Sequence, residues 1–153
     1  MTTRGIQFLK QNRITHQTVK YDHKEKGAEY AARAVGFPLG QTIKTLVVAL
    51  DSHRYALVMM PGDRQVSMKK VAKACNAKRA AMADTTTAQR LTGYLVGGIS
   101  PFGTKNPLKA VMDASLPPNE AVMINAGQRG IMVKIAPGDI IDILKADIAD
   151  LAQ

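Results

Sequence analysis

This chain of 153 residues has no tryptophan, one cysteine, three histidines and no long apolar run. A single cysteine, Cys75, cannot form an internal disulfide, so a reducing compartment and a cytoplasmic location are expected. Without a run of about 18 apolar residues, no membrane span is predicted. The N-terminal segment holds charge at both ends and lacks an apolar signal core, which favours a mature chain without a leader.

The motifs of several enzyme classes are missing as well. The three histidines and the cysteine show no metal-ligand spacing, so no metal site is expected. A phosphate-binding loop and a dinucleotide-binding glycine pattern after a strand are both absent, and no cofactor is expected. Cysteine-nucleophile catalysis is not favoured either, because Cys75 lacks a convincing histidine partner.

Acidic residues are also few: 12 Asp and Glu stand against 21 Lys and Arg, a net charge of +9. This balance favours a polyanionic partner, above all nucleic acid, with a merely solubilising surface as the alternative. Seven basic residues lie between Arg64 and Arg90 with only Asp84 opposing them, whereas 139–150 is acidic. We therefore expect a basic patch. Sparse aromatic residues argue against a stacking platform and leave phosphate contact by lysines.

Hydrophobic periodicity predicts one α+β domain over residues 1–153, with a mixed sheet and helices packed around it. Helices are expected at 3–12, 28–35, 68–75 and 85–91, and strands at 17–22, 43–50, 55–60, 79–82, 110–113, 121–125 and 130–135. A last helix is expected from Pro137, with an apolar stripe that reaches Ile148 and Leu151. Cys75 falls on the apolar face of its helix and is expected to be buried and inert.

The most informative segment is Gly93–Pro101, Gly-Tyr-Leu-Val-Gly-Gly-Ile-Ser-Pro. Apolar residues run into Gly97 and Gly98, which can adopt positive φ and let another molecule approach the main chain. Pro101 stiffens the exit and favours extended backbone at Ser100. Such a loop can bind a ligand with its own N–H and C=O groups, and a tight turn without a ligand is the alternative.

Lys44 stands at the entrance of the apolar strand 43–50. A lysine in this place is either a solvated charge at the edge or a group that faces a pocket. In a pocket it would offer three donors and a point charge to a carbonyl, a phosphate or a ribose. Partial burial would then lower its pKa.

Several segments together resemble the YbaK family, in the order of that family and over nearly the whole chain. They are Lys-Thr-Leu-Val-Val at 44–48, Ser-x-Lys-Lys-Val-Ala-Lys-Ala at 67–74, Met-Ala-Asp at 82–84, the glycine segment at 92–103 and Arg-Gly at 129–130. The family comprises free-standing trans-editing deacylases and the editing insertion of bacterial prolyl-tRNA synthetase, and the likeness is closest to the Cys-tRNA(Pro) deacylase branch. It implies a mixed, partly barrel-like sheet surrounded by helices.

The resemblance implies hydrolysis of the ester between a wrong amino acid and the 3′-terminal adenosine of tRNA(Pro), with Cys-tRNA(Pro) as the first candidate. A ribose hydroxyl or the thiol of a substrate cysteine would assist the attack, and cyclisation through that thiol would make the release lyase-like. The implied partners are the 3′ aminoacyl-adenosine end of tRNA and, as a further candidate, prolyl-tRNA synthetase.

The resemblance also assigns site residues. Lys44 matches the essential lysine, which would orient the terminal nucleotide and stabilise developing charge. The G-x-x-x-P loop, which would surround the aminoacyl ester, corresponds to Gly97, Gly98, Ile99, Ser100 and Pro101. The remaining substrate-binding candidates are Thr45, the pocket tyrosine Tyr21, a second aromatic wall at Tyr30, and Asn125.

One departure from the deacylase branch concerns specificity. That branch commonly has a serine and an aspartate where this chain has Asn125 and Met132. Asn125 can still form hydrogen bonds, but Met132 cannot replace a carboxylate, and the amino acid removed is therefore open. The alternatives are editing of alanine or another small residue, a non-catalytic module that binds tRNA or a synthetase, and a pocket adapted to another small molecule.

Overall fold

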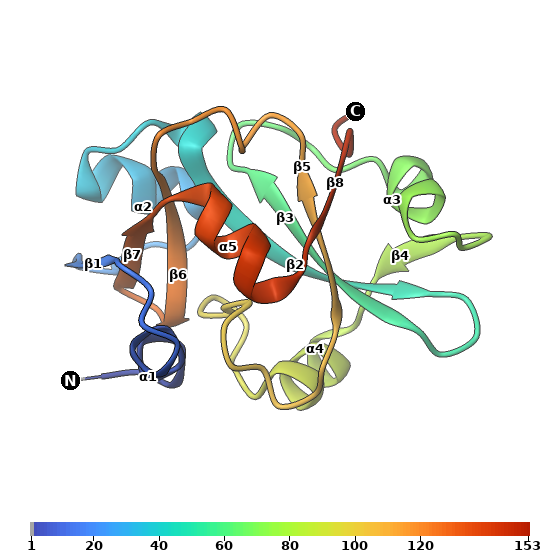
Figure 1. Ribbon diagram of the computed structural model, residues 1–153, viewed down its shortest axis with the longest axis horizontal. Helices are drawn as coiled ribbons and strands as arrows, with labels where there is room; N and C mark the ends of the chain where they lie inside the picture. Colours follow the sequence, from blue (N-terminus) through green and yellow to red (C-terminus); the bar gives the residue numbers. More distant parts are fainter. Residues whose placement is uncertain (1) are drawn as a thin grey trace.

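A mixed eight-stranded sheet runs through the computed structural model, which describes residues 2–153 (Figure 1). The helices are α1 (Arg4–Gln11), α2 (Ala28–Val35), α3 (Met68–Ala74), α4 (Thr85–Thr92) and α5 (Pro137–Leu144), with a 3-10 turn at Leu39–Gln41. The strands are β1 (Gln17–Lys20), β2 (Thr42–Leu50), β3 (Tyr55–Pro61), β4 (Ala80–Met82), β5 (Lys109–Asp113), β6 (Val122–Gln128), β7 (Ile131–Ile135) and β8 (Asp147–Ala149). No helix among these residues is long and apolar enough to cross a membrane.

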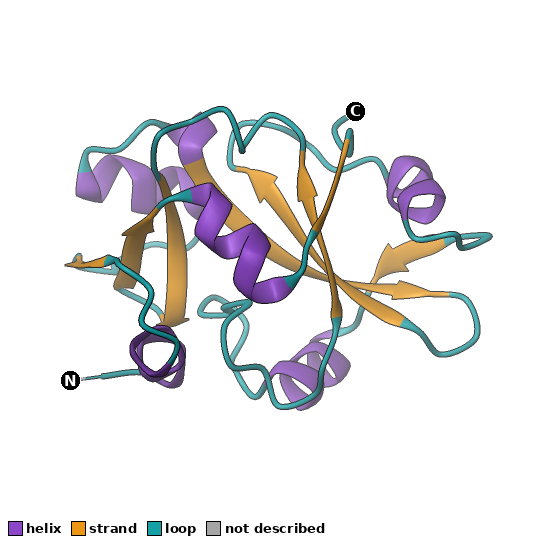
Figure 2. Cartoon of the chain, in the orientation of Figure 1, coloured by secondary structure: helices purple, strands orange, loops and turns teal. Residues whose placement is uncertain are grey.

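The strand order is β1-β7-β6-β2-β3-β5-β8, with β4 paired to the outer end of β2. The predicted hairpin is present: β2 and β3 are antiparallel in a register from Ile43↔Pro61 to Ala49↔Tyr55. Parallel pairs join β2 to β6 and β3 to β5, which confirms the expected mixed sheet. In Figure 2 the strands fan out from the region where the long strands of the hairpin overlap in this view, and the strand order ends at β1 and β8.

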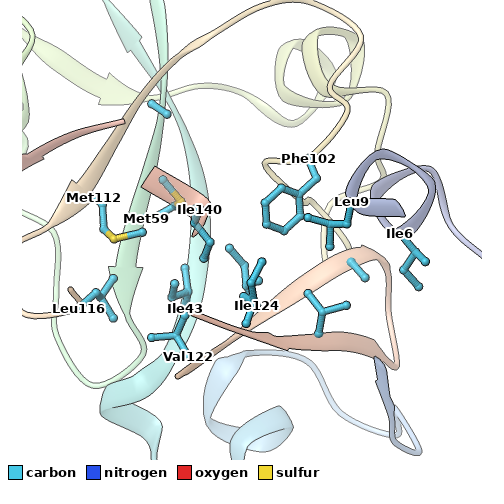
Figure 3. Packing of buried hydrophobic residues seen from close by; sticks show 14 of the residues in the cluster. Ile6, Leu9, Ile43, Met59, Phe102, Met112, Leu116, Val122, Ile124 and Ile140 are labelled. Carbon is cyan, nitrogen blue, oxygen red and sulfur yellow. The ribbon is translucent and has the colours of Figure 1, made fainter. Parts of the chain in front are cut away.

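The largest core lies on the face of the sheet that α1 and α5 cover. Leu9 of α1 and Ile140 of α5 are fully buried there, and Phe102 packs beside them (Figure 3). Because side chains alternate along a strand, Ile124 of β6 points into this core while its neighbours point to the opposite face. On that opposite face Met123 packs with α2. The alternation thus leaves Asn125 on the side away from the main core.

Helix ends follow the capping residues in the sequence. The side chains of Thr3, Ser67 and Asp84 accept the first free backbone N–H groups of α1, α3 and α4. α2 spans the predicted residues and ends at Gly36, which has a left-handed φ of 70°. At the end of α3, Cys75 is 3% exposed, which confirms the expected buried thiol, and burial raises its pKa.

The last helix is shorter than predicted. Lys145 adopts a left-handed φ of 52°, so α5 ends at Leu144 and the chain continues as strand β8, parallel to β5. Ile148 is therefore 49% exposed on an edge strand, and Leu151 is buried beyond it. The carboxylate of Asp113 accepts the N–H of Leu151 at 2.9 Å, a long-range contact that the helical pattern could not indicate. The prediction that Ile148 and Leu151 continue a helical stripe is wrong.

The acidic C-terminal segment folds back onto basic residues. The ammonium of Lys70 pairs with Asp150 at 2.8 Å, and that of Lys109 pairs with Asp147 at 2.7 Å. The separation of charge along the sequence is therefore partly cancelled in space, and the excess of positive charge is carried by the residues outside these pairs.

Candidate ligand-binding site

A cavity of about 340 Å³ opens on the face of the sheet opposite α5, between α2, β2 and the start of α4. Lys44 and Gly97 both border it, although 53 positions separate them in the sequence (97 − 44). The other lining residues are Tyr21, Gly27, Ala28, Ala31, Ile43, Thr45, Leu46, Val47, Met82, Ala83, Thr85, Ala88, Val96, Ile99, Asn125 and Met132. The wall is mostly apolar with a few polar groups, which is the usual composition of a small-ligand site.

Lys44 is fixed by the most central strand of the sheet. It is paired with Met60 across the β2–β3 hairpin, and the preceding residue Ile43 is paired with Ile124 of β6, so its backbone position is set by the ladder. Burial lowers the pKa of its ammonium, and the carboxylate of Asp63 partly offsets that shift. Within residues 2–153 its side chain forms neither an ion pair nor a hydrogen bond. Its donors are therefore free for a ligand in the cavity.

Thr45, the next residue of β2, has an unsatisfied hydroxyl. Its Oγ1 is buried without a hydrogen-bond partner, and no other buried side-chain nitrogen or oxygen in the described part of the chain lacks one. A buried hydroxyl without a partner costs free energy, on the order of 1–3 kcal/mol. Thr45 is among the residues that line the cavity, although alternation along β2 turns its side chain to the face opposite that of Lys44.

The glycine loop borders the same cavity and has backbone N–H groups without acceptors. The N–H of Gly98 donates to the carbonyl of Leu95 at 2.9 Å, which closes a tight turn. Gly97 is the third residue of that turn and has a φ of 97°, a conformation that favours glycine. Of the loop residues that line the cavity, Gly97 and Ile99 have N–H groups with no acceptor among residues 2–153.

Tyr94 and Arg4 hold this loop in place. The hydroxyl of Tyr94 donates to the carbonyl of Phe102, and its ring lies against Gly127 of β6. The guanidinium of Arg4 donates to the carbonyls of Thr92 and Gly103, at 3.2 and 2.7 Å, and stacks over the Tyr94 ring. The loop is therefore anchored at both ends before any ligand arrives, which is the preorganisation that backbone recognition needs.

Asn125 forms the floor of the cavity together with Met132, its partner across β6 and β7. Its side-chain oxygen accepts the N–H groups of Gly127 and Gln128, at 2.7 and 3.2 Å, and so stabilises a bulge in β6. The amide nitrogen makes no hydrogen bond within residues 2–153. Asn125 can therefore offer a ligand one donor group, and Met132 offers only apolar surface.

Of the residues expected at the site, six line the cavity: Tyr21, Lys44, Thr45, Gly97, Ile99 and Asn125. Gly98, Ser100, Pro101 and Tyr30 do not. Ser100 is fully buried and its hydroxyl accepts the N–H of Phe102, so it supports the loop from the core side. Tyr30 lies 6.3 Å from the ring of Tyr21 and donates to the carbonyl of Asp22, and thus borders Tyr21 from outside.

Sequence reasoning missed the contribution of the helices. Ala28 and Ala31 of α2 and Ala88 of α4 line the cavity, where small side chains leave room for a ligand. Ala28 and Ala31 lie three positions apart and so share a helix face, which is a signal the sequence does contain. The exposed side chains at the mouth, Met82 and Val96, carry no such pattern.

The cavity combines a partly buried lysine with two loop residues whose N–H groups have no acceptor within residues 2–153, features that suit a carbonyl- or phosphate-bearing ligand. The chain belongs to the aminoacyl-tRNA editing domain family, whose family model matches residues 23–143.

Two relatives match nearly the whole chain. EbsC of Enterococcus faecalis, by its name a provisional Cys-tRNA(Pro)/Cys-tRNA(Cys) deacylase, is 26% identical over 97% of this chain and 92% of its own. The multifunctional Ser/Thr-tRNA deacylase ProXp-y of Escherichia coli is 26% identical over 98% of this chain and 92% of its own. The fold matches a crystal structure described as a provisional trans-editing enzyme for prolyl-tRNA synthetase. That match has a TM-score of 0.88 and 24% identity, covering 98% of this chain and 95% of the other.

Proposed function

We propose that this protein removes a wrong amino acid from tRNA(Pro) in trans, with Cys-tRNA(Pro) as the first candidate substrate. The observation that carries the proposal is the meeting of Lys44 with the free N–H groups of Gly97 and Ile99 at one cavity. The family and the deacylase names of two relatives support the reaction class.

In the reaction, the oxygen of a water molecule bonds to the ester carbonyl carbon. The bond from that carbon to the ribose oxygen breaks, and the ribose oxygen takes up a proton. Negative charge develops on the carbonyl oxygen, where the N–H groups of Gly97 and Ile99 would donate. Lys44 would orient the terminal adenosine and add a positive charge whose field is strengthened by partial desolvation.

The walls of the cavity favour a small, uncharged amino acid. None of the lining residues is acidic, and Met132 with Ala31 supplies apolar surface where the substrate side chain would lie. Cysteine and alanine fit this environment better than serine does, because a serine hydroxyl gains no carboxylate partner from Met132. An apolar pocket discriminates against an added hydroxyl only by about 10²-fold, so slow release of serine is expected.

A cysteine substrate has a second route. Its thiol sulfur can bond to its own carbonyl carbon while the ester bond to the ribose oxygen breaks, and the thiol proton passes to that oxygen. The products are a cyclic thioester and free tRNA. Release of cysteine without release of alanine, together with the thioester in mass spectra, would identify this route.

The test is a deacylation panel of Cys-, Ala-, Ser- and Pro-tRNA(Pro), with Cys-tRNA(Cys) for comparison. We expect release of cysteine and alanine from tRNA(Pro), and a loss of about 10²–10³-fold in kcat for Lys44→Ala. Lys10→Ala, an exposed lysine of α1, is the matched control. Full activity of Lys44→Ala would remove the role assigned to that lysine.

A non-catalytic module remains the rival because of the net charge of +9. It would bind tRNA with a steep dependence on salt and release nothing from any substrate of the panel. Prolyl-tRNA synthetase is the candidate partner, since the fold is shared with a structure described as a trans-editing enzyme for it. Binding between the purified synthetase and this chain, with and without tRNA(Pro), tests that partnership.

A further inference from the structure

Exposed apolar side chains gather at the mouth of the cavity. Residues 2–153 expose four large apolar side chains, and three of them, Met82, Leu95 and Val96, lie on or next to its lining. Leu95 is 74% exposed. A cluster of exposed apolar groups beside a binding site indicates a surface that something covers.

The conformation of the turn keeps the side chains of Leu95 and Val96 exposed. The carbonyl of Leu95 accepts the N–H of Gly98 at 2.9 Å, and the side-chain oxygen of Gln89 accepts the N–H of Val96 at 3.0 Å. The main chain of both apolar residues is therefore held by hydrogen bonds, to the N–H of Gly98 at Leu95 and to the side chain of Gln89 at Val96. Their exposure belongs to the folded structure of the loop.

Arg129 adds a positive charge to the same turn. Its side chain lies against Gly97, where an added Cβ would stand 3.0 Å from the Cδ of the arginine. Arg129 comes from the connection between β6 and β7, and its guanidinium forms no ion pair or hydrogen bond within residues 2–153. The glycine at position 97 thus allows a free cation to reach the loop that lines the cavity.

We propose that Met82, Leu95, Val96 and Arg129 form a mouth platform that binds the unpaired nucleotides preceding the terminal adenosine of the RNA. Bases would pack by apolar contact on the three aliphatic side chains, without aromatic stacking, and Arg129 would bind a phosphate between them. This proposal rests on the proposed function, because the terminal adenosine is assigned to the adjoining cavity. The net charge of +9 and the unpaired guanidinium favour an RNA strand over an apolar protein surface.

The apolar part is tested with Leu95→Ser and Val96→Ser. Removing a base-packing surface is expected to raise KM for a misacylated tRNA about tenfold. For Leu95→Ser the value of kcat should stay within about twofold, because Leu95 is not among the residues that line the cavity. Ile148→Ser on β8 is the matched control, since Ile148 is a large apolar residue of 49% exposure away from the cavity lining.

The charged part is tested by the dependence of binding on salt. Loss of one phosphate contact to a single strand lowers the slope of log K against log salt by about 0.7. We expect this change for Arg129→Gln and recovery of the slope in Arg129→Lys. Leu95→Ser and Val96→Ser should weaken binding with the slope unchanged, and Arg13→Gln, an exposed arginine after α1 and outside the basic segment 64–90, should change neither quantity.

The binding probe is a fluorescent RNA hairpin with an unpaired CCA end, compared with the same hairpin without those three nucleotides. The variants should weaken binding of the first RNA only. If wild type deacylates tRNA while the variants keep its KM and affinity, the platform is refuted and the proposed function stands. If wild type deacylates nothing but the variants lose affinity for the CCA hairpin, the function fails and the platform stands. Loss of self-association in Leu95→Ser, with RNA binding intact, would assign the patch to a second copy of the chain and overturn the proposal.

Discussion

Lys44 combines a fixed backbone with a side chain that has no protein partner. Burial lowers its pKa, so the folded protein releases this proton at lower pH than the unfolded chain does. Between the two pKa values the unfolded chain binds more protons. The contribution of Lys44 to stability therefore rises with pH through the interval below its ordinary value of 10.5.

The lowered pKa can be measured by acylation of amines at a series of pH values. We expect the rate profile of Lys44 in the folded protein to lie at lower pH than the profile of the same lysine in urea. Peptide mass spectrometry identifies the modified residue, and the unfolded chain serves as the control. A profile at equal or higher pH in the folded protein would contradict the assignment.

At the residue scale, the local sequence predicts some residues of the site and misses others. Lys44 and Gly97 could be predicted as site residues because Lys44 stands at the entrance of an apolar strand and Gly97 belongs to a glycine pair. That Ser100 lies outside the cavity could not be predicted from the sequence. Its hydroxyl accepts the N–H of Phe102 on the core side of the loop, and this contact depends on the fold. The deacylation panel tests the roles proposed for the cavity residues.

The bulge in β6 and the glycine loop meet at Gly127. Its φ is 111°, and an added Cβ would stand 2.6 Å from a ring carbon of Tyr94. Gly127→Ala is therefore expected to lower the free energy of unfolding by about 1–3 kcal/mol through strain and displacement of the ring. Urea unfolding measures this, and unchanged stability would show that the ring moves freely.

Gly138 lies in the first turn of α5, and replacing it by alanine is expected to stabilise the protein. A Cβ there would have no neighbour within 4 Å, and Gly138 is not among the glycines of positive φ. Alanine also has the higher helix propensity, so Gly138→Ala should raise the free energy of unfolding by about 0.5–1 kcal/mol. The same urea experiment applies, and a loss of stability would mean that the start of α5 needs the flexibility of glycine.

Helix ends were predictable where a cap stands in the sequence, as at Ser67, Asp84 and Gly36. The end of α5 was not, because Lys145 has no sequence signal for its left-handed conformation. The residues after it alternate polar and apolar over too short a stretch to separate a strand from a helix. Pairing of β8 with β5 decides the outcome, and that contact is long-range.

At the scale of the whole molecule, the C-terminal residues complete one of the hydrophobic cores. Leu151 is fully buried in the core formed by α3 and strands β2, β3 and β5. Leu151→Ala is expected to lower the free energy of unfolding by about 2–5 kcal/mol through loss of apolar contact and a residual cavity. Ile148→Ala, exposed on β8, should cost much less. Equal losses for the two variants in thermal or urea unfolding would contradict the role given to Leu151.

The topology of the molecule also set limits on prediction. The mixed sheet followed from the order of helical and strand patterns, and it is confirmed. The basic patch stays a prediction, and the pairing of Lys70 with Asp150, 80 positions apart in the sequence, shows that charge along the chain does not by itself give charge in space. Only tertiary structure brings such segments together.

The contact of Tyr94 with Gly127 also has a consequence for how this chain can change over generations. An aromatic ring at position 94 leaves no room for any side chain at position 127. The φ of 111° at Gly127 disfavours a side chain there even without the ring. Position 127 is therefore expected to stay glycine as long as position 94 keeps its ring, and a smaller residue at 94 would remove only one of the two restrictions.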